Sequence, residues 1–233
     1  MDNQNYVNNI FSSVSNKYDV MNDIMSFGVH RHWKHKFLDK INDYSSSILD
    51  VACGTGDIIY SICQRAKKYQ VTPNVTGVDI NEEMLEIAKK RMINKNILNT
   101  NFIKCDGINL PFPDSSFNYY LISFGIRNIK NINQAVSEAY RVLKPGGCFL
   151  CLEFSKVQNA VFNRFYQIYS KFIPTIGGIV TQNKDAYEYL VESIKLFYSQ
   201  EEFVEVLKSN NFARVSYEEL TMGVVSIYKG YKT

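Results

Sequence analysis

The stretch ILDVACGTGDII, residues 48–59, constrains the fold more than any other part of this chain. Its first half is an apolar run that suits a buried strand, and the apolar residues after it recur at the spacing of a helix. Between the two runs, Gly54 and Gly56 allow the backbone to turn sharply and a ligand to approach it closely. A strand, a glycine turn and a helix in this order predict a nucleotide-like site at the carboxyl end of a parallel strand.

The rest of the chain alternates strand-like and helix-like segments, which favours a parallel sheet covered by helices on both faces. The predicted strands are 48–52, 74–79, 101–105, 117–124, 147–154, 212–219 and 222–229. The predicted helices are 57–69, 82–94, 131–143, 185–197 and 200–209, and residues 5–42 also have a helical pattern. The last two strands are close enough in sequence to form an antiparallel pair at the sheet edge.

Composition and charge exclude several classes of protein. The net charge of +3 is too small to indicate a nucleic-acid partner. No apolar run approaches the ~18 residues of a membrane span, and the N-terminus lacks the apolar core of a secretory signal. The five cysteines are scattered and odd in number, which fits a reducing cytosol. Cys148 and Cys151 would lie on opposite faces of a strand, so we expect no redox or metal function there.

The three histidines, His30, His32 and His35, are close in sequence and raise the question of a metal site. On a helix their side chains would spread over more than half of the circumference and could not converge on one ion. We therefore expect no bound metal, and we expect a lid or a structural cap formed by His30, Arg31, Trp33 and Lys34.

The turn at residues 54–57 does not match the common phosphate-binding loops. A dinucleotide-binding turn needs a third glycine where this chain has Ile59, and no Gly-Lys-Ser/Thr sequence of a phosphate loop follows. A ligand without phosphates needs only the close turn, together with carboxylates for its charge and its hydroxyls. Asp50 and Asp57 suit a cationic or zwitterionic ligand.

Two further strand ends carry acids. Asp79 ends the strand 74–79, where its carboxylate can accept both hydroxyls of a ribose. Asp106 follows the next strand, where it can accept from an adenine amino group while a neighbouring backbone N–H meets a ring nitrogen. An amino-acid moiety, a ribose and an adenine are the parts of S-adenosylmethionine, which the sequence predicts as the cofactor. The alternative, that Asp79 only caps the helix at 82, stays open here.

Segments spread over nearly the whole chain carry a common pattern. They are FSSVSNKYDVMNDIMSFGVHRHWK, LDVACGTGD, DINEEML, LPFPDSSFN, SFGIRNI, YRVLKPGG, LEFSK, YLVESI and MGVVSIYKGYKT. In these segments the chain resembles the ubiquinone/menaquinone biosynthesis C-methyltransferase family, a branch of the class I methyltransferases. The resemblance implies a Rossmann-like α/β fold with a mostly parallel seven-stranded sheet, helices on both faces and an antiparallel edge strand. It also implies N-terminal helices and a helical insertion before the last helix.

The resemblance also implies which residues contact the cofactor. It agrees with the turn and the strand ends, and it alone adds Ser123. The predicted cofactor-binding set is Asp50, Gly54, Thr55, Gly56, Asp79, Asp106, Gly107 and Ser123. Gly107 stands where the family usually has Ala, which should leave a backbone N–H contact intact.

The reaction that the resemblance implies is methylation of a ring carbon in a polyprenylated quinol, of the benzoquinol type, the demethylmenaquinol type or both. A ring carbon becomes nucleophilic when an ortho or para hydroxyl loses its proton, so the site must favour a phenolate. Arg127 stays protonated, so we assign it to stabilising the phenolate, with Asn128 orienting the substrate. The alternative is that Arg127 pairs with an acid such as Glu153 for structure alone.

The segment 162–173 carries an aromatic stripe at helical spacing, which suits either an isoprenoid tail or ordinary core. From it we take Phe165, Tyr166 and Tyr169 as substrate-binding residues. We expect a single domain, 1–233, in four parts. They are an N-terminal helical cap at 1–46, a cofactor-binding core at 47–155, an acceptor-side insertion at 156–185 and the rest of the sheet at 186–233.

The expected partners are the polyprenylated quinol, the membrane surface or a quinone-biosynthesis complex, and a second copy of the chain in a homodimer, with no nucleic acid. We expect a cytoplasmic protein that is peripherally associated with the inner membrane, because a chain without a span must still reach a bilayer-resident substrate. Two other functions stay open. One is a small-molecule or RNA methyltransferase that shares only the cofactor fold, and the other is a non-catalytic scaffold of a quinone-synthesis complex.

Overall fold

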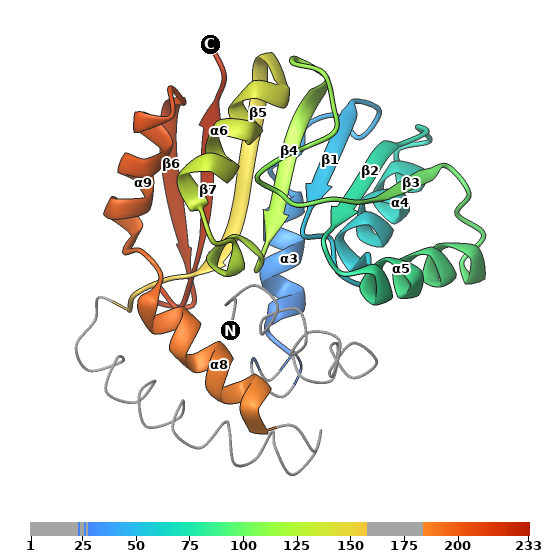
Figure 1. Ribbon diagram of the computed structural model, residues 1–233. Coiled ribbons are helices and arrows are strands. Elements are labelled where there is room, and N and C mark those ends of the chain that lie inside the picture. Colours follow the sequence, from blue (N-terminus) through green and yellow to red (C-terminus); the bar gives the residue numbers. More distant parts are fainter. Residues whose placement is uncertain (1–22, 24–25, 27, 158–183) are drawn as a thin grey trace.

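A seven-stranded sheet forms the centre of the structure, a computed structural model that describes residues 23, 26, 28–157 and 184–233 (Figure 1). Its strands are β1 (Ser47–Val51), β2 (Asn74–Asp79), β3 (Thr100–Lys104), β4 (Phe117–Ser123), β5 (Leu143–Phe154), β6 (Ala213–Leu220) and β7 (Val225–Tyr231). They lie side by side in the order β3-β2-β1-β4-β5-β7-β6. The first five strands pair in parallel, and β7 is antiparallel to both β5 and β6. The predicted parallel sheet with an antiparallel pair at one edge is confirmed.

Two strands begin three or more residues away from the positions that the sequence predicts, β5 because of strand pairing and β7 because of a turn. The prediction starts β5 at residue 147, yet Leu143 already pairs with Phe117, and the register shifts after this pair. The Lys-Pro-Gly-Gly sequence is therefore an irregularity within β5, with Gly146 at a φ of 79°. The prediction starts β7 at residue 222, but residues 221–223 have positive φ angles and form the turn before Val225.

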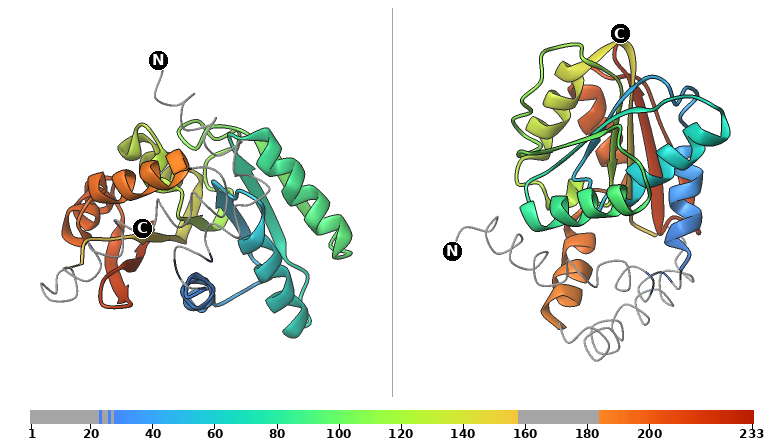
Figure 2. Two further views of the ribbon diagram at one scale, coloured as in Figure 1. Left: turned by 90° about the horizontal axis from the view of Figure 1, so that it is seen from below. Right: turned by 90° about the vertical axis from the view of Figure 1, so that its right-hand side faces the viewer.

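Helices cover both faces of the sheet (Figure 2). They are α3 (His30–Leu38), α4 (Asp57–Lys68), α5 (Glu82–Asn94), α6 (Ile132–Val142), α8 (Lys184–Leu196), α9 (Gln200–Ser209) and the short 3-10 helix η2 (Ile126–Asn128). Three begin with side-chain caps: Asn81 accepts from the Met84 N–H, Asn131 accepts from the Gln134 N–H, and Ser199 forms a capping box with Glu202. The five helices predicted after residue 47 are confirmed to within one residue at each end.

The two faces of the sheet have separate hydrophobic cores. One core holds Trp33 and Phe37 of α3 together with Ile62 of α4, and the other holds buried residues of α6 and α9. Cys148 lies in the first core and Cys151 in the second, which confirms that the two thiols lie on opposite faces of β5. Helix α3 is therefore an integral layer of the fold, because its apolar side chains complete one of the two cores.

The carboxyl ends of β1 and β4 lie on the side of the sheet where α3 and α8 are found (Figure 1). The left view of Figure 2 looks at the molecule from this side. Ligand sites of open parallel sheets lie at the carboxyl ends of the strands. Much of the predicted helical segment 5–42 lies outside the described residues, and so do Phe165, Tyr166 and Tyr169.

Candidate active site

A hollow lies at the carboxyl ends of β1 and β4, beside α3 and the first turn of α4. Its wall consists of Lys34, Asp50, Ala52, Cys53, Gly54, Thr55, Asp57, Ile58, Ser123 and Phe124. Four residues of the predicted cofactor-binding set belong to this wall: Asp50, Gly54, Thr55 and Ser123. The parallel pairing of the two strands brings them together, because Val51 of β1 lies opposite Ile122 of β4.

Both strands continue into strained backbone at the hollow. Ala52, directly after β1, has a φ of 53°, and Phe124, directly after β4, has a φ of 56°. Such positive φ angles are uncommon for residues with a side chain and concentrate at functional sites. A Cβ atom on Gly125 would lie 2.6 Å from the Cβ of Ala52. Glycine at this position of the SFGIRN segment therefore allows the ends of the two strands to come close together.

Gly56 has two structural reasons to be glycine. It is the N-terminal cap residue of α4 with a φ of 76°, a conformation that favours glycine. A Cβ atom on it would also lie 3.0 Å from the Cβ of Ala88 in α5. The predicted sharp turn is confirmed, and the close packing against α5 is a second constraint that the sequence does not show.

Asp79, at the end of β2, is hydrogen-bonded to the glycine turn. Its Oδ2 accepts from the Gly54 N–H at 2.8 Å and its Oδ1 from the Asn81 N–H at 2.9 Å. Burial raises the pKa of this carboxyl, against the effect of these backbone hydrogen bonds. Each oxygen can accept a second hydrogen bond, so both remain able to accept from ribose hydroxyls. The side chain that caps α5 is that of Asn81, so the alternative that Asp79 only caps this helix is wrong.

Asp50 and Ser123 leave buried polar atoms unsatisfied at the hollow. Asp50 is 1% exposed, and within the described part of the chain neither its Oδ2 nor the Ser123 Oγ has a hydrogen-bond partner. Burial, together with the charges of Asp57 and Asp79, raises the pKa of Asp50 well above its ordinary value. Folded proteins rarely leave such atoms without a partner, so both point to a ligand in the hollow.

These groups fit S-adenosylmethionine. The ammonium and sulfonium groups of that molecule are cations, which a buried carboxylate such as Asp50 would stabilise in its charged form. The turn at Gly54 lets the backbone approach the ligand, and Asp79 is joined to that turn with accepting capacity left for the ribose. Of the three charged residues in the wall, Lys34, Asp50 and Asp57, two are acids, which disfavours the pyrophosphate of a dinucleotide.

Asp106 and Gly107 lie next to Asp79 but outside the wall of the hollow. The Cys105 N–H donates to the backbone oxygen of Asp79 at 3.1 Å, which brings the loop after β3 beside the predicted ribose position. A Cβ atom on Gly107 would lie 3.2 Å from the Ile129 side chain, so this loop is closely packed. The contact of Asp106 and Gly107 with the adenine stays a prediction.

Arg127 lies in η2, just past β4, and its side chain is only 3% exposed. Its Nη1 donates to Glu153 Oε1 at 2.6 Å and to the Phe124 carbonyl at 2.7 Å, and its Nε lies 3.4 Å from Ser193 Oγ. The ion pair with Glu153, which the sequence offers as the alternative to a catalytic role, therefore exists. Among the described residues, however, Nη2 has no hydrogen-bond partner. One side of the guanidinium thus remains available to a substrate.

Helix α8 contributes two polar side chains to the residues around η2. The Tyr189 hydroxyl donates to Asn128 Oδ1 at 2.9 Å, and Ser193 lies against Arg127. Neither residue is among the predicted site residues, although both lie in the YLVESI segment that carries part of the family resemblance. Arg127 and Asn128 do not line the hollow, but Phe124, which does, accepts the hydrogen bond from Arg127.

The sequence predicts Lys34 only as part of a lid or cap, whereas the structure places it in the wall of the hollow. Its Nζ forms an ion pair with Asp57 at the start of α4, within the wall of the hollow. His30 and His35, in contrast, lie next to different aspartates. In the part of the chain that the structure describes, no group of three potential ligands could hold a metal ion.

Comparison with known proteins identifies the family. The model of the ubiE/COQ5 methyltransferase family matches residues 1–232. This chain belongs to that family. The ubiquinone/menaquinone biosynthesis C-methyltransferase UbiE of Rickettsia akari is 52% identical over 231 residues, which cover 98% of this chain and 93% of that protein. UbiE of Rickettsia felis is 53% identical over the same number of residues, with the same coverage.

Solved structures with low sequence identity share the fold. A methyltransferase from Thermotoga maritima, described as a possible histamine N-methyltransferase, has a TM-score of 0.67 at 20% identity and covers 97% of this chain and 99% of its own. A methyltransferase from Aquifex aeolicus has a TM-score of 0.62 at 17% identity and covers 86% of this chain and 89% of its own. The predicted class I methyltransferase fold is confirmed.

Proposed function

We propose that this chain transfers a methyl group from S-adenosylmethionine to a ring carbon of a polyprenylated quinol. Membership of the family supports the methyltransferase activity and the cofactor, and the names of the Rickettsia relatives support the quinol. The observation that carries the proposal is the position of Phe124. It lines the cofactor hollow and also accepts the hydrogen bond from Arg127, so a methyl donor and a phenolate-stabilising cation would be neighbours.

Some of the described side chains would bind the cofactor, and others would bind the acceptor quinol. When bound, S-adenosylmethionine supplies an electrophilic methyl group on its sulfonium. Asp50 and Asp79 hold its charged and hydroxyl groups, while the Nη2 of Arg127 donates to the quinol oxygen as that oxygen loses its proton. A fixed cation in a site that excludes water stabilises a phenolate more than water does. In the net change the S–CH3 bond of the donor is broken and the ring C–H becomes C–CH3, with S-adenosylhomocysteine and one proton as the other products.

Two neighbours of Arg127 hold the acceptor side in position. Glu153 accepts from the Arg127 Nη1 and so fixes the plane of the guanidinium. Tyr189 donates to the amide oxygen of Asn128, so the NH2 group of Asn128 can still donate to the quinol and orient it. Positioning of this kind accounts for a large part of the acceleration in many enzymes.

Arg127→Lys tests the assignment of Arg127 with little disturbance of the fold. Lysine keeps a positive charge for Glu153 but loses the planar fork, and with it the donor at Nη2. We expect a folded variant that binds S-adenosylmethionine within about twofold of the wild type and turns over about 100-fold more slowly, the typical cost of one lost oxyanion donor. Near-normal turnover of this variant, measured by radiolabelled methyl transfer, would show that Arg127 is structural.

The substrate itself is tested with the purified chain and two acceptors, a polyprenyl benzoquinol and a demethylmenaquinol, in detergent micelles. Mass spectrometry of the extracted quinones should show a gain of one methyl group in at least one of them. If the chain binds S-adenosylmethionine but methylates neither quinol, the non-catalytic scaffold becomes the better explanation.

None of the helices in the described part of the chain is long and apolar enough to cross a bilayer. We infer that the quinol is met at the membrane surface and that the aromatic stripe at residues 162–173 binds its tail. Replacing Phe165 and Tyr169 by Ser should then lower kcat/KM more for long-tailed than for short-tailed quinols, because each buried methylene contributes about 0.8 kcal/mol. An unchanged ratio of the two values with a lower melting temperature would assign the stripe to the core.

A further inference from the structure

Lys34 brings a positive charge to a wall that is otherwise acidic. Among the described residues that line the hollow, it is the only cation, whereas Asp50 and Asp57 are both acids. Its side chain is 13% exposed, and its Nζ pairs with Asp57 Oδ2. Burial would raise the pKa of Asp57, but the charge and the hydrogen bond of Lys34 together hold this pKa below its ordinary value.

Helix α3 holds Lys34 firmly in this position. Trp33 and Phe37, its neighbours on the helix, are 3% and 0% exposed and belong to the core that α3 shares with α4. The Trp33 Nε1 also donates to Thr221 Oγ1 at 2.7 Å, which joins α3 to the turn between β6 and β7. Because the helix is fixed on both sides, its lysine is a fixed component of the hollow.

The charges of the cofactor favour a cation at this end of the site. The methionine part of S-adenosylmethionine carries both an ammonium and a carboxylate. Asp50 suits the ammonium, but the carboxylate would be repelled by Asp50 and Asp57 unless a positive charge stood beside it. Lysine has three N–H donors, so Lys34 can bind a second carboxylate while it keeps Asp57.

We propose that Lys34 binds the carboxylate of the methionine part of S-adenosylmethionine. The inference rests on the proposed function, since it assumes this cofactor, and it adds a recognition residue from outside the sheet. It also gives the N-terminal helix α3 a direct part in cofactor selection, because a ligand without the amino-acid moiety would gain nothing from this lysine.

A pair of ligands that differ in that moiety tests the proposal. S-adenosylhomocysteine has the carboxylate, and 5′-deoxy-5′-methylthioadenosine lacks the whole amino-acid part. By calorimetry, Lys34→Met should weaken binding of S-adenosylhomocysteine about tenfold or more, the usual effect of losing a charged hydrogen bond. Binding of methylthioadenosine should stay within about twofold. An equal loss for both ligands, or a loss for neither, would overturn the proposal.

Two further variants separate ligand binding from a structural role. Lys40→Met removes another lysine that pairs with an acid, Glu218, away from the hollow, and it should change neither affinity. Asp57→Asn removes the partner of Lys34. If Lys34 only holds Asp57, this variant should lose affinity for S-adenosylhomocysteine as Lys34→Met does. If Lys34 binds the ligand, Asp57→Asn should lose much less of that affinity than Lys34→Met does.

The same measurements distinguish this inference from the proposed function. If the wild-type chain binds neither S-adenosylhomocysteine nor S-adenosylmethionine, the cofactor assignment itself is wrong. If the wild type binds both ligands and Lys34→Met binds S-adenosylhomocysteine equally well, only the role of Lys34 is wrong.

Discussion

Two buried carboxylates near the same edge of the sheet, Asp50 and Glu153, have opposite surroundings. Glu153 is 0% exposed, and it accepts from the Arg127 guanidinium at 2.6 Å and from the Phe154 N–H at 2.9 Å. Asp50 is 1% exposed, and in the described structure its Oδ2 accepts from nothing. Burial raises the pKa of both groups, but an arginine opposes the effect at Glu153 and neighbouring acids add to it at Asp50.

The difference distinguishes a carboxylate whose hydrogen bonds and charge are satisfied within the protein from one that needs a ligand as its partner. The charge of Glu153 is compensated within the protein, so this residue serves to orient Arg127. The charge of Asp50 lacks a hydrogen-bonded cation, and an isolated buried charge is strongly unfavourable. Its natural complement is the cationic end of the cofactor. Three experiments test this distinction.

The largest expected effect is on the Glu153 side. Glu153→Ala leaves the buried guanidinium of Arg127 without its counterion, which typically costs about 3–5 kcal/mol of folding free energy. Chemical denaturation should show this loss. Combining Glu153→Met with Arg127→Met should recover most of the stability while turnover stays low, because no unpaired charge remains in the double variant.

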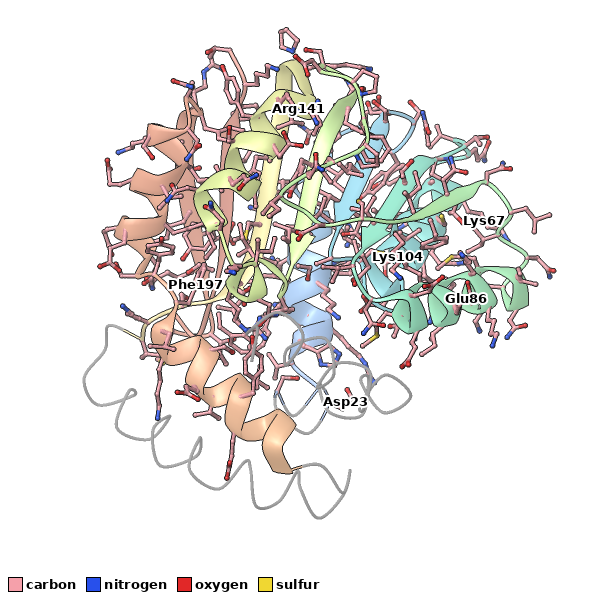
Figure 3. All side chains as sticks on the ribbon, viewed as in Figure 1. Asp23, Lys67, Glu86, Lys104, Arg141 and Phe197 are labelled. Carbon is pink, nitrogen blue, oxygen red and sulfur yellow. The ribbon has the colours of Figure 1, made fainter. Side chains whose placement is uncertain are left out.

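A matched control lies at the opposite end of the central strands, where Arg141 of α6 is found (Figure 3). Its partner Asp114 has a side chain that is 76% exposed, so Asp114→Ala should cost less than about 1 kcal/mol. If Glu153→Ala lowered the free energy of unfolding no more than Asp114→Ala does, Arg127 would not need Glu153 as its counterion. The contrast between Glu153 and Asp50 would then be wrong.

The second prediction concerns Asp50→Asn, which should have opposite effects on binding and on stability. Affinity for S-adenosylmethionine should fall about 10- to 100-fold, since hydrogen bonds to charged groups contribute about 1.5–3 kcal/mol. The ligand-free variant should melt higher at neutral pH, by about 2–4 °C for each kcal/mol gained. The direction follows from the pKa of Asp50, which is higher in the folded than in the unfolded protein. As pH rises from the unfolded-state pKa to the folded-state pKa, the free energy of unfolding falls, and asparagine avoids this loss because it does not ionise. A lower melting temperature would show that Asp50 supports the free fold.

The smallest expected effect is proton release on cofactor binding. A cation beside Asp50 favours its ionised form, so binding should lower its raised pKa and release up to one proton. Affinity should therefore increase as pH rises through the pKa of the free protein and level off above it. Calorimetry in two buffers with different ionisation enthalpies measures this release, and Asp50→Asn should abolish it. If Asp50→Asn released as many protons on cofactor binding as the wild type, the proton would come from another group.

Local sequence determined most of the fold and the cofactor side of the site. The glycine turn at 54–57, the acid at the end of β2 and the cap at Asn81 all act within a few residues of their own positions. Side-chain period, capping and positive φ are short-range properties, so these elements could be predicted from the chain alone. The strand ends then meet because parallel strands place their carboxyl ends at one edge.

The remaining features depend on contacts between residues that are far apart in the chain, and only the tertiary structure shows these contacts. The charge of Lys34 in α3 opposes the rise in the pKa of Asp50, and the position of Arg127 depends on Glu153 of β5 and Ser193 of α8. The early start of β5 depends on pairing between Leu143 and Phe117. No local pattern carries this information, because burial and the distance between charged atoms exist only once separate elements are packed. The sequence could therefore name Arg127 and Asp50, but only the packing distinguished the compensated charge from the one that awaits a ligand.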